Sequence, residues 1–171
     1  MADTQTPEGN GAAGAEASPR FRLAIQYIKD LSFENPNAPR SLIASAQTRP
    51  NIQVSVNVGA QPLGDDNYEV ELKLSASAKH EENTTFLCEL SYGGVFMLEN
   101  FPQEQIQPFL LIEGPRQLFP FARRIIADAP RDGGFPPLML EPVDFAALYR
   151  QQMAQRAQAQ QGAPAPPPSD A

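Results

Sequence analysis

Hydrophobic and polar residues alternate along four stretches of the first hundred residues. The stretches are 21–34, 52–58, 68–79 and 85–98. A period of two is typical of a strand that buries one face. Turn-forming residues follow the second and third stretches, at 64–67 and 80–83. The pattern therefore predicts four strands in an antiparallel, meander-like sheet, and the pair Gly93-Gly94 indicates either a bulge or a close backbone approach.

The C-terminal third changes to helical spacing. A short helix is expected over Gln103–Leu111, and a longer one is expected to begin near Phe119, because Pro120 is tolerated best in a first turn. Asp144 is a candidate N-cap for a last helix, in which Phe145, Leu148, Tyr149 and Met153 form an apolar stripe. Strands followed by helices indicate an α+β fold with the helices packed on one face of the sheet.

The length and the two ends define the domain organisation. A chain of 171 residues is typical of one domain. Residues 1–19 are rich in Gly, Pro and acids, and residues 156–171 are rich in Ala, Gln and Pro, so both are expected to be disordered tails. The folded part is predicted to span residues 20–155.

Charge and composition exclude several classes of function. The formal net charge of −7 argues against nucleic-acid binding, and one His and one Cys leave no His- or Cys-rich metal site. Cys88 lies on an apolar strand face, which favours a buried thiol over a nucleophile.

No cofactor-binding motif is found, so we expect neither an enzyme nor a cofactor. The polar N-terminus is unlike a secretory signal, and no apolar run is long enough for membrane insertion, which favours the cytoplasm.

Two features call for an explanation beyond folding. Ten acidic residues and only two lysines lie between Asp65 and Glu113, which indicates either a solvated sheet face or a docking surface for a basic partner. Leu87 shares the outward face with Glu89 and favours the docking surface. Apolar residues also occur in irregular segments, among the prolines of 135–142 and in the connection 40–50. They either wrap the core or line a groove or an oligomer interface.

Several blocks of the sequence resemble the SecB family of bacterial protein-export chaperones. They occur in the family's order and spacing and cover about residues 20–155. The blocks are Lys29–Pro39, Tyr68–Val70, Thr85–Glu89, Tyr92–Phe96, Leu118–Arg123, Gly134–Leu140 and Pro142–Phe145.

The resemblance implies a fold, an activity and partners. The fold is a four-stranded antiparallel sheet with helices on one side, assembled into a homotetramer that is a dimer of dimers. The activity is to hold unfolded precursor proteins without ATP in the cytoplasm and to deliver them to the translocation ATPase SecA. The competing hypotheses are a small-molecule-binding α+β oligomer and an enzyme.

The resemblance also implies site residues. The SecA contacts carried over by motif are Asp30, Glu34, Leu87 and Glu89. The groove for unfolded clients is expected to include Leu42, Phe119, Phe135, Leu138 and Leu140. Cys88 is expected near the subunit packing surface. Zinc carried by the docking segment of SecA would belong to that partner, so no metal ligands are expected in this chain.

Overall fold

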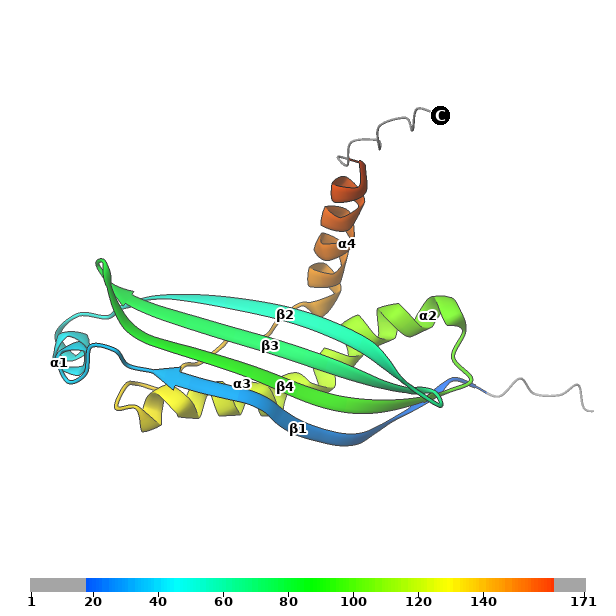
Figure 1. The fold of residues 1–171 in the computed structure, drawn as a ribbon, viewed down its shortest axis with the longest axis horizontal. Helices are drawn as coiled ribbons and strands as arrows, with labels where there is room; N and C mark the ends of the chain where they lie inside the picture. The colour runs from blue at the N-terminus through cyan, green and yellow to red at the C-terminus, as the bar shows by residue number, and fades with distance from the viewer. Residues whose placement is uncertain (1–17, 162–171) are drawn as a thin grey trace, which may run out of the picture.

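Four long antiparallel strands form one sheet in the computed structural model, which describes residues 18–161 (Figure 1). The strands are β1 (Arg20–Glu34), β2 (Asn51–Gly64), β3 (Asn67–His80) and β4 (Asn83–Glu99). Their order across the sheet is β1-β4-β3-β2, so β2, β3 and β4 form a meander and β1 lies beside β4. The predicted α+β class and the four strands are confirmed.

Short turns join the three strands of the meander. Asp65 and Asp66 connect β2 to β3 with φ values of 51° and 58°. Two successive positive φ values are typical of a type I′ turn, whose twist matches that of the two strands that it joins. The predicted turn at 64–67 is therefore confirmed.

Two bulges in β1 change which of its residues face the helices and which face the outer side of the sheet. The pairing with β4 shifts between Leu23 and Ile25 and again between Ile28 and Asp30. Leu23 is opposite Phe96, which faces the helices, whereas Tyr27 is opposite Gly93 on the outer face. The regular alternation of hydrophobic residues in this strand did not reveal the change, because each bulge adds one residue without altering the local pattern.

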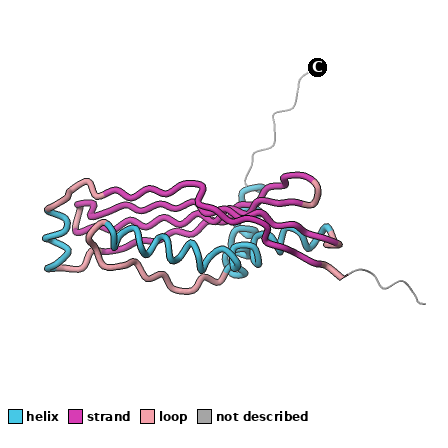
Figure 2. The backbone as a smooth tube through the Cα atoms, turned by 90° about the horizontal axis from the view of Figure 1, so that it is seen from below, coloured by secondary structure: helices cyan, strands magenta, loops and turns pink. Residues whose placement is uncertain are grey.

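The helices are α1 (Arg40–Gln47), α2 (Gln103–Pro108), α3 (Gly114–Asp132) and α4 (Phe145–Gln161), with a π-helical segment η1 (Phe109–Glu113) between α2 and α3. Figure 2 shows that helices cover one side of the sheet. The segment 40–50 was expected to be only a connection, and α1 occupies most of it. This helix has eight residues, too few for a clear helical period in the sequence.

The helix α3 begins at Gly114, so the prediction of a start near Phe119 is wrong. Pro115 occupies the first turn, and Pro120 lies inside the helix. An internal proline removes one backbone hydrogen bond. The fully buried residues Leu118 and Ile126 hold this helix against the sheet and offset that loss.

The last helix begins as predicted and runs further than expected. The backbone N–H of Ala147 donates to Asp144 Oδ1 at 3.0 Å, which confirms the cap. α4 continues to Gln161, beyond the expected end of the folded part at residue 155, and the Ala- and Gln-rich sequence favours helix there. The rest of the predicted C-terminal tail, 162–171, and most of the N-terminal tail, 1–17, lie outside the described residues.

The core lies between the sheet and α3. Its largest fully buried side chains come from β3, β4, α3 and the start of α4: Val70, Leu72, Leu74, Leu90, Phe96, Leu118, Ile126 and Phe145. Gly94 admits Leu118 closely, because a Cβ at Gly94 would lie 2.6 Å from Leu118 Cδ2. The close approach at Gly94 is therefore made by a side chain, whereas the sequence predicted a bulge or a close backbone approach.

Candidate functional site

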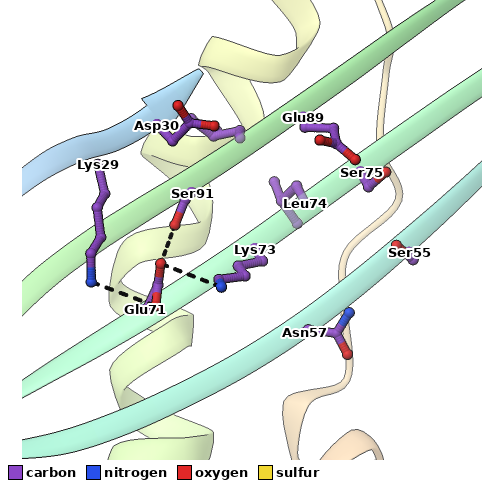
Figure 3. Close-up of a pocket in the computed structure, with 11 residues that line it drawn as sticks. Lys29, Asp30, Ser55, Asn57, Glu71, Lys73, Leu74, Ser75, Glu89 and Ser91 are labelled. Atoms are coloured by element: carbon purple, nitrogen blue, oxygen red, sulfur yellow. Dashed lines mark hydrogen bonds and ion pairs between the residues drawn. The ribbon is translucent and has the colours of Figure 1, made fainter. Parts of the chain in front are cut away.

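The outer face of the sheet, on the side away from α3, carries a polar cavity of about 590 Å³ (Figure 3). All four strands contribute to it. Its polar lining residues are Lys29, Asp30, Ser55, Asn57, Glu71, Lys73, Ser75, Glu89 and Ser91. This face therefore offers charges of both signs and several hydroxyl and amide groups to a partner.

A buried carboxylate organises the outer face beside this cavity. Glu69 is only 6% exposed and accepts hydrogen bonds from the Tyr27 hydroxyl and from Lys29 Nζ, the latter at 3.2 Å. Gln61 Nε2 also donates to it. These interactions join β1, β2 and β3. The Tyr27 hydroxyl and the other donors hold the pKa of Glu69 below its usual value, and the same contact with burial raises the pKa of Tyr27 to about 12.

A second carboxylate, that of Glu71, lies inside the cavity, and its interactions are weaker than those of Glu69. Glu71 forms ion pairs with Lys29 at 3.7 Å and with Lys73 at 3.8 Å, and it accepts a hydrogen bond from the Ser91 hydroxyl (Figure 3). Exposed ion pairs of this kind contribute about 0–1 kcal/mol. Lys73 is therefore free to exchange this contact for that of a partner, whereas Lys29 is also held by Glu69.

The four residues expected to contact SecA lie together at one end of the outer face. Glu34 is opposite Leu87 and Ser32 is opposite Glu89 in the β1–β4 pairing, so the side chains share a face on neighbouring strands. Asp30 and Glu89 also line the polar cavity, as Figure 3 shows. Within residues 18–161, Asp30, Glu34 and Glu89 have no ion pair or hydrogen-bonded side-chain partner. We refer to Asp30, Glu34, Leu87 and Glu89 as the acidic patch.

An apolar cavity of about 270 Å³ lies on the helix side of the sheet, near α1. Ile52 of β2, Phe86 of β4 and the segment 135–138 form most of its wall, with Ser45, Arg49 and Pro50 at the remaining side. The rings of Phe86 and Phe135 are 5.0 Å apart between centroids. Of the predicted groove residues, Phe135 and Leu138 line this cavity directly.

The other predicted groove residues lie elsewhere. Leu42 is half-buried and lies 3.1 Å from the position of a Cβ on Gly134, next to the cavity-lining Phe135. Phe119 and Leu140 are buried in the closed core, where the Phe119 ring packs 5.7 Å from that of Phe145. Within residues 18–161, Phe119 and Leu140 line neither the polar nor the apolar cavity described above, and their place in a client groove stays a prediction.

Cys88 does not lie on a surface. Its side chain is 0% exposed within this one chain and belongs to the hydrophobic core on the helix side of the sheet. The thiol itself is therefore covered within this chain, and the expectation that Cys88 lies near the subunit packing surface stays a prediction. Burial raises the pKa of this thiol to about 11, which keeps it protonated near neutral pH.

Sequence reasoning missed two parts of these surfaces. The Glu69 network could not be found from the sequence, because the position of Tyr27 depends on the bulges of β1. Ile52 and Phe86 were predicted to lie in strands, on the face of the sheet that the helices were expected to cover. The sequence contained one indirect indication that Ile52 lines a cavity. Ile52 belongs to an edge strand, and the helices that cover the middle of a sheet do not reach its edges.

A sheet with a charged outer face and an apolar cavity on its other side has the surfaces of a protein that binds other polypeptides. A family model described as "Preprotein translocase subunit SecB" matches residues 14–156. The chain belongs to this family of protein-export chaperones.

Relatives described as protein-export protein SecB support the assignment. The protein of Azorhizobium caulinodans is 54% identical over 87% of this chain and 92% of its own length. That of Zymomonas mobilis is 57% identical over 84% of this chain and 87% of its own length. The resemblance stated from the sequence blocks is therefore confirmed.

A solved structure supports the fold. The SecB-like chaperone Rv1957 of Mycobacterium tuberculosis, solved in complex with a ChAD peptide from the antitoxin HigA1, matches with a TM-score of 0.61 at 12% identity. The match covers 72% of this chain and 91% of that protein.

None of the helices within residues 18–161 is both long enough and apolar enough to cross a lipid bilayer.

Proposed function

We propose that this protein binds unfolded precursor proteins in the cytoplasm without ATP and delivers them to SecA. The observation that carries the proposal is the placement of two different surfaces on opposite sides of one sheet. The apolar cavity suits hydrophobic segments of a client, and the acidic patch suits a basic partner. Client and SecA can then be bound at the same time, which delivery requires.

The apolar cavity, bounded by Phe86, Phe135 and Leu138, is the proposed client site, and Leu42 lies at its border. Unfolded chains expose apolar side chains, and burying them contributes roughly 25 cal/mol per Å² of apolar surface. Folded clients hide the same side chains and are not bound. Several such sites on one assembly bind one long chain by avidity.

Calorimetric titration with a slow-folding precursor tests the client site. We expect binding to the unfolded precursor and none to the folded one, in the absence of nucleotide. Leu138→Ala is expected to weaken binding several-fold, because it shortens a side chain of the cavity wall. Met139→Ala, at the neighbouring exposed residue, is the matched control and should bind normally. Equal binding of folded and unfolded precursor would contradict the proposal.

The acidic patch is the proposed SecA site. Carboxylates without partners attract a basic segment and speed its association, and Leu87 offers the segment an apolar contact. The double variant Leu87→Arg with Glu89→Lys should abolish SecA binding at low salt. Met97→Arg with Glu99→Lys makes the same change in charge on the same strand and face, at the far end. If both double variants bound SecA equally, the docking surface would lie elsewhere.

A homotetramer is the proposed assembly. Large apolar side chains remain exposed on β1 and α3, among them Ile25 at 60% and Phe121. Exposed apolar surface of this kind favours contacts between subunits. Sedimentation equilibrium at micromolar concentration should give the mass of four chains, and a mass of one chain would contradict this assembly.

A further inference from the structure

The middle of β1 has the opposite orientation to its two ends. Leu23 and Phe33 face the helix side, where both pack against the core. Tyr27 lies an even number of residues from each of them, so in a regular strand it would share their face. It lies instead opposite Gly93 on the outer face, between the two bulges. Interactions on the outer face must therefore hold this part of the strand.

The first of these interactions is a hydrogen bond that crosses β4. The Tyr27 hydroxyl donates to Glu69 Oε1 of β3. The Tyr27 ring lies over Gly93 of β4, where an added Cβ would be 2.8 Å from Tyr27 Cε2. From the other side, Gln61 Nε2 of β2 donates to the same carboxylate. The hydrogen bonds therefore extend across the whole width of the sheet, from β1 to β2.

The second interaction holds the bulge that follows Tyr27. Lys29 is the extra residue of this bulge, because the residues before and after it lie opposite neighbouring residues of β4. Its Nζ is 3.2 Å from both carboxylate oxygens of Glu69 and 3.7 Å from Glu71 Oε2, the latter drawn in Figure 3. The bulge of the edge strand is thus attached to β3 through a side chain.

Asp30 follows this bulge directly and belongs to the acidic patch. Its carboxylate lacks a side-chain partner within residues 18–161, so the side chain does not fix its own direction. A bulge interrupts the regular alternation of a strand and bends it, so the direction of Asp30 depends on the backbone of the bulge. Glu34, by contrast, lies in the regularly paired end of β1, next to Phe33.

We propose that Glu69 and Tyr27 are positioning residues for the acidic patch: together with Lys29 they hold the bulge of β1 and thereby direct Asp30 toward SecA. Glu69 is 6% exposed and therefore offers almost no surface to a partner itself. A carboxylate that is already held in its binding direction loses less conformational freedom when the partner binds. This inference rests on the proposed SecA site and adds the residues that shape it.

The variant Tyr27→Phe tests the proposal without a change of charge. We expect the affinity for SecA to fall by about two- to tenfold. The loss should come from faster dissociation, because the charges that steer association are unchanged. Unfolded precursor should bind normally, since Tyr27 and the apolar cavity lie on opposite sides of the sheet. An affinity for SecA equal to that of the natural protein would overturn the proposal.

A control variant separates positioning from a general loss of stability. Ile126→Val shortens a fully buried side chain of α3, so it should lower the thermal unfolding midpoint. It should nevertheless bind SecA as the natural protein does. A loss of SecA affinity in Ile126→Val as large as that in Tyr27→Phe would show that SecA binding follows overall stability, and would overturn the proposal.

A double-mutant cycle shows whether Tyr27 acts through Asp30. In the Asp30→Asn background, Tyr27→Phe should cause little further loss of SecA affinity, because the carboxylate that it positions is gone. In the Glu34→Gln background, the full loss should remain, because Glu34 lies beyond the bulge. Equal further losses in the two backgrounds would mean that Tyr27 acts on the outer face as a whole, and would overturn the proposal.

The variant Lys29→Met separates positioning from charge. Removing a positive charge beside the acidic patch strengthens the attraction of a basic partner, so charge alone predicts slower dissociation of SecA. Loss of the attachment at the bulge predicts the opposite. We expect SecA to dissociate several-fold faster from Lys29→Met than from the natural protein, and dissociation that is unchanged or slower would contradict the positioning role.

The outcomes also separate this inference from the proposed function. Absence of SecA binding by the natural protein would reject the SecA site and the positioning role together. SecA binding that Tyr27→Phe leaves unchanged would keep the site and reject the positioning role. Loss of both SecA and precursor binding in Tyr27→Phe would show that the contact with Glu69 supports the whole fold, and would also reject the proposal.

Discussion

On the helix side of β3 and β4, Leu72, Leu90 and Phe96 are buried, whereas on the outer side of the same strands Lys73 and Glu89 are exposed to solvent. Successive residues of one strand therefore belong to two different environments. The helix side contributes most of the stability, because apolar burial is the dominant favourable contribution to folding. The outer side can change its charges at little cost to the fold, which suits a surface that recognises a partner.

The outer face is not uniform, and Glu69 marks the exception. This carboxylate is as buried as many core residues, and it depends on hydrogen bonds from three other side chains. The acidic patch, by contrast, has no such partners within residues 18–161. One part of the outer face is thus fixed by internal hydrogen bonds, while the other is available for binding.

The comparison of the two faces can be tested first at Phe96 and its neighbour Val95. Phe96→Ala should lower the free energy of unfolding by about 3–5 kcal/mol, because it leaves a cavity in the core. Val95→Ala, on the outer face of the same strand, should cost far less. Urea unfolding of both variants measures the difference. Similar losses at the two positions would show that the outer face is also part of a packed core.

The paired glycines give a second test of moderate size. Gly94→Ala should destabilise the protein by about 1–3 kcal/mol, because the added Cβ would overlap Leu118 at 2.6 Å. Gly59→Ala is the matched control in β2, where no atom lies within 4 Å of an added Cβ. It should be neutral or slightly stabilising. Thermal unfolding of both variants provides the measurement, and equal midpoints would contradict the close approach.

The sequence predicted the strands well because each one has a single regular pattern. Residues 68–79 alternate without interruption, and β3 occupies this range with its apolar residues on the helix side. The same reasoning failed for α3, whose start was expected near Phe119. Pro120 has an unfavourable local effect on a helix, and only tertiary packing, which a sequence pattern does not contain, outweighs it.

The site was predictable only where its residues are close in sequence or belong to a known motif. Leu87 and Glu89 stand on one strand, so their shared face follows from alternation, and Phe135 and Leu138 belong to one segment. Phe119 was expected in the groove as well; it is buried within this chain, and its place in the groove stays a prediction. The Tyr27–Glu69 contact joins residues 42 positions apart, and its existence depends on two bulges that leave no trace in the alternation.

The smallest effect is expected at the Tyr27–Glu69 contact, and it should depend on pH. Tyr27→Phe removes one hydrogen bond to a carboxylate and should cost about 1–2 kcal/mol at neutral pH. Folding lowers the pKa of Glu69, so the contribution of this carboxylate is present above its ordinary pKa and is lost as the pH falls through the lower folded value. Folding raises the pKa of Tyr27 to about 12, so the contribution of the phenol is present below about pH 10 and is lost as the pH rises toward 12.

Unfolding of the natural protein and of Tyr27→Phe, compared across pH, measures this contribution as the difference between two curves. The difference should be constant near neutral pH and should shrink at both ends of the range. Tyr149→Phe, at a tyrosine of α4 for which no side-chain hydrogen bond occurs within the described residues, is the control and should give no such profile. A difference that stayed constant from pH 3 to pH 11 would mean that Tyr27 contributes through packing over Gly93 alone, and that the outer face is held together without Glu69.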